Sequence, residues 1–206
     1  ERDRPVIVMV DQRLPMFFGS EKKMKSVVAA ELAALTAWRT IAVGDRVGAI
    51  LFNDKREVEI RARRSERQLL TWLGDLSKMN NDLSVAPGHI SNPGALLNAL
   101  QLLERRAGHD YLVVIISDFY GWNEECLKII KRVNRHNDIV CSLVFDPLER
   151  DISEAQSLVV SDGHFQLEID PAQHALGEKF EASFQSSIAQ VQSELNRHQI
   201  PILPVD

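Results

Sequence analysis

The sequence predicts an α/β fold, a Rossmann-like three-layer sandwich around a mostly parallel sheet with one antiparallel edge strand. Two observations favour it. Short, wholly apolar runs, which suit strands buried on both faces, alternate with longer segments whose apolar residues recur at three- and four-residue steps. One run turns directly into a stretch of alternating apolar and charged residues, which is the pattern of an edge hairpin.

Each element has a local justification. Four polar residues, Ser20, Ser65, Asn92 and Asn123, each precede a helical pattern and can cap it. The expected helices are residues 21–41, 65–77, 92–106, 123–134 and 172–198. The expected strands are residues 6–10, 44–52, 56–62, 111–119, 138–146 and 200–205.

The domain organisation follows from this alternation. We expect a single domain over residues 1–206, with a hairpin insertion at about 158–168 around the Asp162-Gly163 turn. The chain begins ERDRPV, without methionine and directly before a strand, so we expect it to be a fragment of a longer protein.

Composition narrows the functional class. A net charge of -5 leaves no basic surplus for phosphates, so we expect no nucleic-acid partner. Two cysteines, Cys126 and Cys141, are too few for a disulfide scaffold and suit reduced thiols in a cytoplasmic protein. No apolar run approaches the roughly 20 residues that cross a bilayer. We expect no membrane contact from this fragment, and the parent protein can still carry an anchor.

Three aspartates, Asp11, Asp118 and Asp146, each end a buried strand. Ligands bind beyond the carboxyl ends of the strands in such sheets, so we expect Asp11 and Asp118 to lie close together. Converging carboxylates are typical of a Mg²⁺ site, and a Mg²⁺-dependent hydrolase using all three aspartates is the alternative function.

Known hydrolase patterns fit the sequence poorly. A haloacid-dehalogenase-type phosphatase needs a second acid where Arg13 stands, and a receiver-type phosphoacceptor needs an acidic pair where Gln12 follows Asp11. A PIN-like nuclease would need Asp45, which is expected at the opposite sheet edge. No G-x-S-x-G elbow and no G-x-x-x-x-G-K loop occur. We therefore assign no catalytic residue.

Four stretches in order carry a family resemblance: "VIVMVDQRLPMFFGS", "GDRVGAILFND", "VVIISDF" and "LVFDPLERDI". They resemble the bacterial domain of unknown function 58 family, which has a von Willebrand factor A-like domain. The similarity covers essentially the whole chain. It implies the predicted fold and a metal-ion-dependent adhesion site, in which Asp-x-Ser-x-Ser, a threonine and a second aspartate hold Mg²⁺.

Carried over to this chain, the adhesion site is degenerate. Asp11 and Asp118 match its aspartates, but Arg13 and Pro15 stand at the serine positions. The threonine position lies near Gly94, where Ser91 is the nearest hydroxyl. Proline offers no side-chain oxygen, and a guanidinium only donates. We expect no cofactor, with Mg²⁺ binding weak or lost.

Arg13 has two interpretations. In the first, it supplies the charge that Mg²⁺ would bring and pairs with Asp11 or Asp118. In the second, it points to solvent and Asp11 binds backbone N–H groups of the following loop.

The resemblance implies a non-enzymatic protein-protein interaction domain working with a MoxR-type AAA+ ATPase in chaperone-like maturation or remodelling of other proteins. Residues in the same loops are candidates for partner binding, although the apolar ones can equally belong to the core. These candidates are Arg13, Met16, Phe17, Phe18, Ser91, Tyr120 and Trp122.

Overall fold

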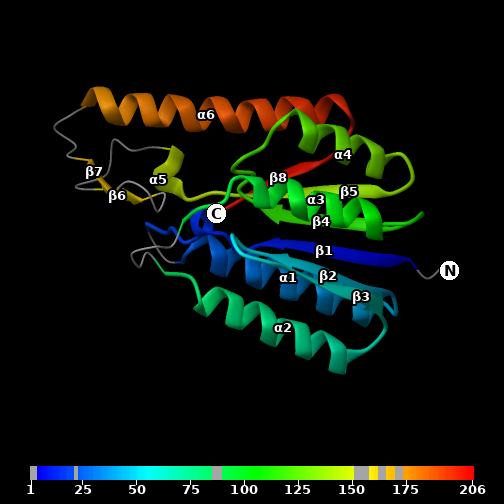
Figure 1. Cartoon of the computed structure of the whole chain (residues 1–206). Coiled ribbons are helices and arrows are strands. Elements are labelled where there is room, and N and C mark those ends of the chain that lie inside the picture. Colours follow the sequence, from blue (N-terminus) through cyan, green and yellow to red (C-terminus); the bar gives the residue numbers. More distant parts are fainter. Residues whose placement is uncertain (1–3, 21–22, 85–89, 151–157, 162–165, 170–173) are drawn as a thin grey trace.

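The fold is built on one six-stranded sheet, in a computed structural model that describes residues 4–20, 23–84, 90–150, 158–161, 166–169 and 174–206 (Figure 1). The strand order is β3-β2-β1-β4-β5-β8. All neighbours pair in parallel except β2 and β3, which are antiparallel. The predicted fold class is confirmed. The strands are β1 (Pro5–Asp11), β2 (Arg46–Phe52), β3 (Glu57–Arg63), β4 (Leu112–Ser117), β5 (Asp138–Val144) and β8 (Ile202–Val205).

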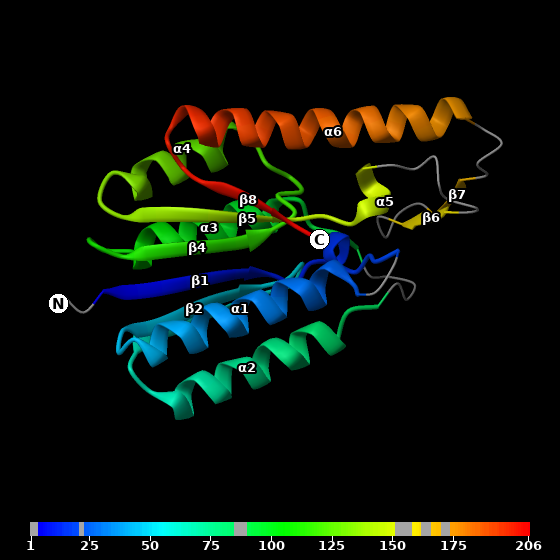
Figure 2. The same ribbon diagram turned by 180° about the vertical axis from the view of Figure 1, so that it is seen from behind.

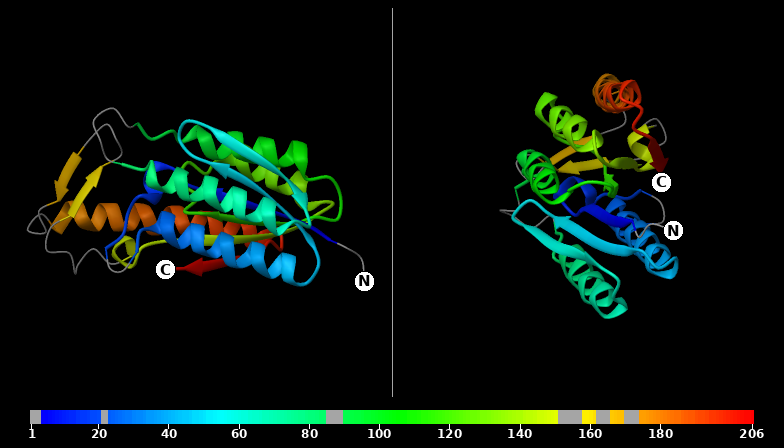
Figure 3. Two further views of the ribbon diagram at one scale, coloured as in Figure 1. Left: turned by 90° about the horizontal axis from the view of Figure 1, so that it is seen from below. Right: turned by 90° about the vertical axis from the view of Figure 1, so that its right-hand side faces the viewer.

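Helices lie on both faces of this sheet (Figures 2 and 3). One face carries α1 (Lys25–Ala42) and α2 (Glu66–Asn81). The other carries α3 (Gly94–Arg106), α4 (Glu124–Asn134) and α6 (His174–Arg197). Two short turns, the 3₁₀ helix η1 (Leu14–Met16) and α5 (Pro147–Arg150), follow β1 and β5.

Alternate residues of β1 belong to two separate hydrophobic cores, one on each face of the sheet. Ile7 and Met9 pack with α3 and α4, whereas Val6, Val8 and Val10 pack with α1 and α2. A central strand covered on both faces has no polar side, which is why its sequence is apolar without interruption.

Two of the expected helix caps are confirmed. The Ser65 hydroxyl accepts from Gln68 N, and the Asn123 amide oxygen accepts from Glu125 N and Cys126 N. The Ser20 cap is wrong, because α1 begins only at Lys25 and Ser20 binds Asp146 instead. The loop before α1 is therefore longer than the sequence indicated.

The residues expected to form a hairpin pair as β6 (Leu158–Ser161) and β7 (Gln166–Ile169), an antiparallel two-stranded sheet separate from the main one. The Asp162-Gly163 turn lies outside the described residues. Within the described part of the chain, no helix is both long and apolar enough to cross a membrane.

Candidate functional site

Three loops meet at the carboxyl ends of the central strands. The first follows β1 and contains η1, the second follows β4, and the third follows β5 and contains α5 (Figures 1 and 2). Parallel strands place these loops at one edge of the sheet. This edge therefore brings together residues far apart in the sequence.

Arg13 is fully buried at this edge, with 0% of its side chain exposed. Its guanidinium forms a bidentate ion pair with Asp11: Nε lies 2.9 Å from Oδ1, and Nη2 lies 2.6 Å from Oδ2. Nη1 donates to the Tyr120 carbonyl at 2.9 Å, and Nη2 lies 3.6 Å from Asp118 Oδ1. Its charged carbon also lies 5.4 Å from the centre of the Phe52 ring. Arg13 thus links Asp11 and Asp118, which lie close together as predicted.

Asp11 is held by more than Arg13. Its Oδ1 also accepts the backbone N–H of Arg13 at 3.0 Å, as the second interpretation expected. Arg13 does not point to solvent, however; it is buried and paired with Asp11, as in the first interpretation. The Ser117 hydroxyl donates to Oδ2 at 2.6 Å and accepts from Phe119 N at 2.9 Å. Burial raises the pKa of the Asp11 carboxyl, while the Arg13 charge opposes that rise. Burial acts to lower the pKa of Arg13, but the charges of Asp11, Asp118 and Asp54 together raise it, so Arg13 keeps its proton.

A second buried cation, Lys25, neutralises the other aspartate. Its ammonium lies 3.0 Å from Asp118 Oδ2 and 2.6 Å from Glu149 Oε1. Burial acts to raise the pKa of Asp118, but the charges of Lys25 and Arg13 prevail and lower it. The described loops therefore hold a chain of alternating charges, from Asp11 through Arg13, Asp118 and Lys25 to Glu149.

Sequence reasoning missed Lys25 and Glu149. A signal for Lys25 was present, because it lies one helical step before a stripe of buried alanines spaced four residues apart. That stripe consists of Ala29, Ala33 and Ala37. Glu149 gave no comparable signal, since its contact with Lys25 spans 124 residues of sequence.

Asp146 has a different role from the other two strand-end aspartates. Its carboxylate accepts Ser20 N at 2.7 Å, the Ser20 hydroxyl, and Leu148 N at 2.9 Å. Its own backbone N–H donates to Glu149 Oε2 at 2.9 Å. Asp146 therefore fixes the third loop against the first.

The residues present do not fit a divalent metal between Asp11 and Asp118. Nitrogen donors of Arg13 and Lys25 already contact these carboxylates, and neither side chain can offer a lone pair to a cation at neutral pH. Among the described residues, no group of three or more His, Cys, Asp or Glu side chains is arranged to hold a metal ion.

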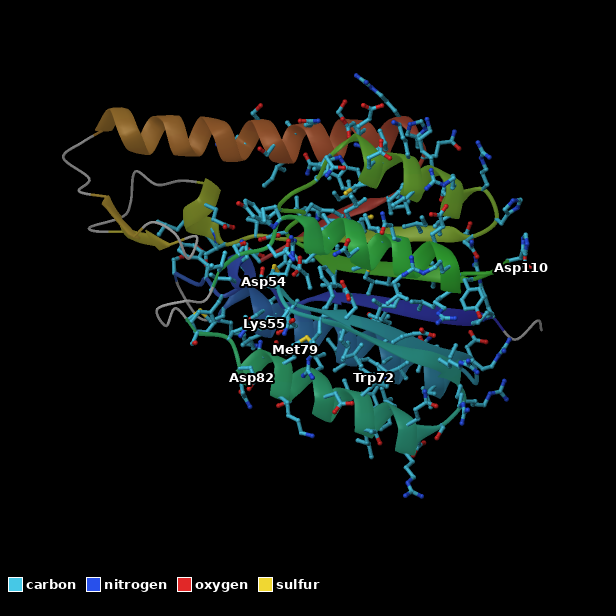
Figure 4. The ribbon with its side chains drawn as sticks, viewed as in Figure 1. Asp54, Lys55, Trp72, Met79, Asp82 and Asp110 are labelled. Carbon is cyan, nitrogen blue, oxygen red and sulfur yellow. The ribbon has the colours of Figure 1, made fainter. Side chains whose placement is uncertain are left out.

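Asp54, another residue that sequence reasoning missed, ties the loop before α3 to η1. It accepts Leu14 N at 2.6 Å and Asn92 N at 2.7 Å. It lies at the same end of the sheet as the charged cluster, with Asp110 at the far end (Figure 4). The neighbouring Ser91 is half-buried, and within the described structure its Oγ has no hydrogen-bond partner.

Gly121 closes the loop after β4 against the loop before α3. Its φ is +81°, and a Cβ at this position would lie only 2.5 Å from the Pro93 carbonyl oxygen. Only glycine accepts both the left-handed backbone and this close approach.

The apolar partner candidates are placed differently from one another. Met16 is fully buried in the core against α1 and α2, so the core alternative holds for it and its candidacy as a partner contact is wrong. Phe17 and Phe18 are half-buried. Arg13, also a candidate, is sealed from solvent and cannot touch a partner in this conformation.

Tyr120 is the exposed aromatic of this set, with 43% of its surface accessible. Trp122 is half-buried and fixed from two sides. Its indole N–H donates to Glu194 Oε2 at 2.7 Å, and its ring meets Phe119 edge-on with centroids 5.8 Å apart. Trp122 therefore docks α6 rather than standing free in the loop.

A comparison against known families finds one whose model covers most of this chain. The family described as "Protein of unknown function DUF58" matches residues 1–190. The chain belongs to this family. Curated relatives are "Uncharacterized protein Rv1480" of Mycobacterium tuberculosis and "Uncharacterized protein Mb1516" of Mycobacterium bovis. Each is 25% identical over 180 residues, covering 84% of this chain and 53% of the relative. The chain thus spans about half the length of these curated relatives.

Solved structures support the same architecture. An aerotolerance-related membrane protein from Bacteroides fragilis superposes with a TM-score of 0.54 at 14% identity, covering 98% of this chain and 92% of that one. BatB from Bacteroides thetaiotaomicron gives 0.53 at 11% identity, over 98% and 90%. The SpRpn10 VWA domain gives 0.44 at 14% identity, over 68% and 75%. The likeness to the first two structures shows that this DUF58 chain shares their α/β fold.

Proposed function

We propose that this DUF58 domain is a non-enzymatic protein-interaction module whose adhesion-type site works without metal. The observation that supports it best is the buried pair of Arg13 and Asp11, with the guanidinium bridging to Asp118. In this proposal Arg13 provides the positive charge that a divalent cation provides in an intact adhesion site.

The energetics of the pair favour permanent replacement over competition. To enter, a metal would have to expel a guanidinium that makes three hydrogen bonds to Asp11 and one to the Tyr120 carbonyl. Removing the partner of a buried charge costs about 3–5 kcal/mol, and both members of this pair are fully buried. Lys25 places a second charge on the other side of Asp118.

Metal titration tests the proposal directly. Thermal unfolding of the chain is followed while Mg²⁺ or Mn²⁺ is raised to millimolar concentration, beside Arg13→Ser as a matched variant. We expect the unchanged chain to show no saturable shift. In Arg13→Ser the carboxylates lose a counter-ion and regain a hydroxyl, so metal should stabilise it. A saturable shift of the unchanged chain at sub-millimolar metal would overturn the proposal.

We further infer that the partner is a MoxR-type AAA+ ATPase that acts with this domain in maturing or remodelling other proteins. Support comes from the family resemblance of the sequence, and from Tyr120, Phe17 and Phe18 at the rim of the site. The test is co-purification with the ATPase from the native cell. It compares the unchanged chain with Tyr120→Ala and with Leu35→Ala, a control on α1 that is more exposed, at 69% against 43%. Loss with Tyr120→Ala alone supports this rim.

The hydrolase alternative stays a prediction and is separated by one variant. Asp11→Ala would abolish turnover in a hydrolase using Asp11, Asp118 and Asp146, whereas an interaction domain would lose only binding or stability.

For location, we propose a cytoplasmic domain of a membrane-anchored parent. One solved structure with a similar fold, described as an aerotolerance-related membrane protein from Bacteroides fragilis, motivates this. Fractionation of cells carrying the full-length parent tests it.

A further inference from the structure

The outer face of α1 is apolar, although α1 lies at the surface of the molecule beside α2 (Figure 2). Leu35 lies two residues from both Ala33 and Ala37, which are fully buried against the sheet. Each residue turns a helix by about 100°, so the Leu35 side chain projects away from the sheet. On this outer face Leu35 is 69% exposed and Trp38 is 40% exposed. A surface helix normally turns a polar face to water, so this face has the composition of a contact surface.

Two opposite charges flank Leu35 at equal spacing along α1. Glu31 lies four residues before it and Arg39 four residues after it. Residues four apart are neighbours on a helix surface, so the three side chains form one row. Arg39 is exposed. Glu31 bonds Lys23 at 2.7 Å, but these side chains are 51% and 50% exposed, so another cation can replace Lys23 at little cost.

We propose that the outer face of α1 is a self-association surface, on which α1 of a second copy of this chain packs antiparallel about a two-fold axis at Leu35. Across such an axis, a residue before Leu35 faces the residue equally far after Leu35 in the other copy. Glu31 of each copy therefore faces Arg39 of the other. The row of charges is complementary to itself, and the ion pair forms twice.

The same arrangement matches the apolar residues. Leu35 meets its own copy at the axis. Leu32 and Trp38, three residues to either side, face each other across the two chains, as do Val28 and Ala42 at seven residues to either side. Leu32 and Val28 are half-buried, and Ala42 is exposed. The contact thus has an apolar centre with charged pairs beside it, as protein interfaces commonly do.

Charge also excludes the other ways of pairing this face with itself. An axis at Glu31 or at Arg39 would place that residue against its own copy, so like charges would meet. A parallel pair of α1 helices would place Glu31 beside Glu31 and Arg39 beside Arg39. The antiparallel arrangement centred on Leu35 brings both charges of the row opposite their complements.

The size of the contact sets the expected strength. α1 has 18 residues and is therefore about 27 Å long. One pair of such helices buries less than about 800 Å² per partner, the area of a standard interface, so we expect a dissociation constant on the order of 100 µM. Leu35 lies ten residues, about 15 Å, along α1 from Lys25. The dimer leaves the site loops open, and this inference does not depend on the proposed function.

Sedimentation equilibrium of the 206-residue chain tests the proposal, over concentrations that bracket the expected dissociation constant tenfold on each side. Glu31→Arg and Arg39→Glu should each weaken self-association at least about tenfold, because like charges then meet at two places. The chain carrying both changes should regain the strength of the unchanged chain. Leu35→Asp should abolish the dimer. Leu70→Asp, on α2 at 59% exposed, is the matched control and should leave the dimer unchanged.

A cross-link tests where the axis lies. The two natural cysteines, Cys126 and Cys141, are buried, so an added surface thiol reacts on its own. Leu35→Cys treated with diamide should form a disulfide-linked dimer, because the two copies of this residue meet at the axis. Leu70→Cys should stay monomeric on a non-reducing gel. Circular dichroism establishes that each variant is folded before it is compared.

The outcomes are distinct. A chain that stays monomeric at the highest concentration overturns the proposal. If it dimerises but neither charge change weakens the dimer, or if the double change fails to restore it, the antiparallel α1 contact is refuted. Cross-linking of Leu70→Cys as readily as Leu35→Cys refutes it as well. None of these results alters the metal titration, so the proposed function stands or falls separately.

Discussion

The two ends of the central sheet each carry an Arg–Asp ion pair in opposite surroundings. At the carboxyl end, Arg13 and Asp11 are both 0% exposed. At the amino end, Arg4 bonds Asp138 with side chains 41% and 71% exposed. Asp54 and Asp110 mark the two ends in Figure 4.

The comparison shows that the same type of ion pair can matter little or greatly to stability, depending on whether it is exposed or buried. An exposed pair is surrounded by water that can replace either partner, so it contributes about 0–1 kcal/mol. A buried pair adds little net stability, yet losing one partner leaves a charge that nothing can solvate. The exposed pair of Arg4 and Asp138 is therefore dispensable, whereas the buried pair of Arg13 and Asp11 holds the site loops together.

The largest expected effect comes from Asp11→Asn. Arg13 cannot release its proton, so the variant keeps a buried guanidinium without its counter-ion, and we expect unfolding to become about 3–5 kcal/mol easier. Asp138→Asn, the same change on the exposed pair, should cost less than about 1 kcal/mol. Urea denaturation measures both. Equal losses would contradict the contrast.

Removing the cation should cost less than removing the anion. In Arg13→Met, Asp11 can take up a proton, which its raised pKa favours, so part of the penalty is relieved. We expect a loss on the order of 2–3 kcal/mol, and Asp11→Asn combined with Arg13→Met should lose clearly less than the sum. A double-mutant cycle in urea provides the coupling, and additive losses would argue against a direct pair.

Two serines at the carboxyl end of the sheet allow a similar comparison of single hydroxyl groups, one that is hydrogen-bonded and one that is not. The Ser117 hydroxyl bonds Asp11 and Phe119 N, so Ser117→Ala should cost about 1–3 kcal/mol. The Ser91 hydroxyl has no partner in the described structure, so Ser91→Ala should change stability by less than about 0.5 kcal/mol. Thermal unfolding of the two variants side by side decides this, and a costly Ser91→Ala would reveal a bond from that hydroxyl.

The smallest expected effect concerns pH. Burial raises the pKa of Glu149 above its ordinary 4.5, so the folded chain holds this proton more tightly than the unfolded chain. The stability that Glu149 contributes relative to Glu149→Gln should therefore fall as pH rises from 4.5 and level off above the raised pKa. Urea midpoints of both chains between pH 4 and 8 measure it. A rise over the same window would mean that Lys25 outweighs burial.

The fold was largely readable from the sequence because it depends on local pattern. Uninterrupted apolar runs such as residues 6–10 need a strand covered on both faces, and Ser65 and Asn123 satisfy helix N–H groups within three residues of themselves. Ser20 misled for the same reason: its local context suits a cap, and a tertiary partner, Asp146, took the hydroxyl.

The site was readable only in part. The sequence by itself determined that Asp11 and Asp118 would meet, since both end central parallel strands, and that Arg13 and Pro15 could not ligate a metal. Only the tertiary structure decided that Arg13 is buried, that Met16 is core, and that Lys25 and Glu149 join the cluster. The physical reason is that charge pairing depends on distances and burial set by loop packing, which residue type and spacing do not encode.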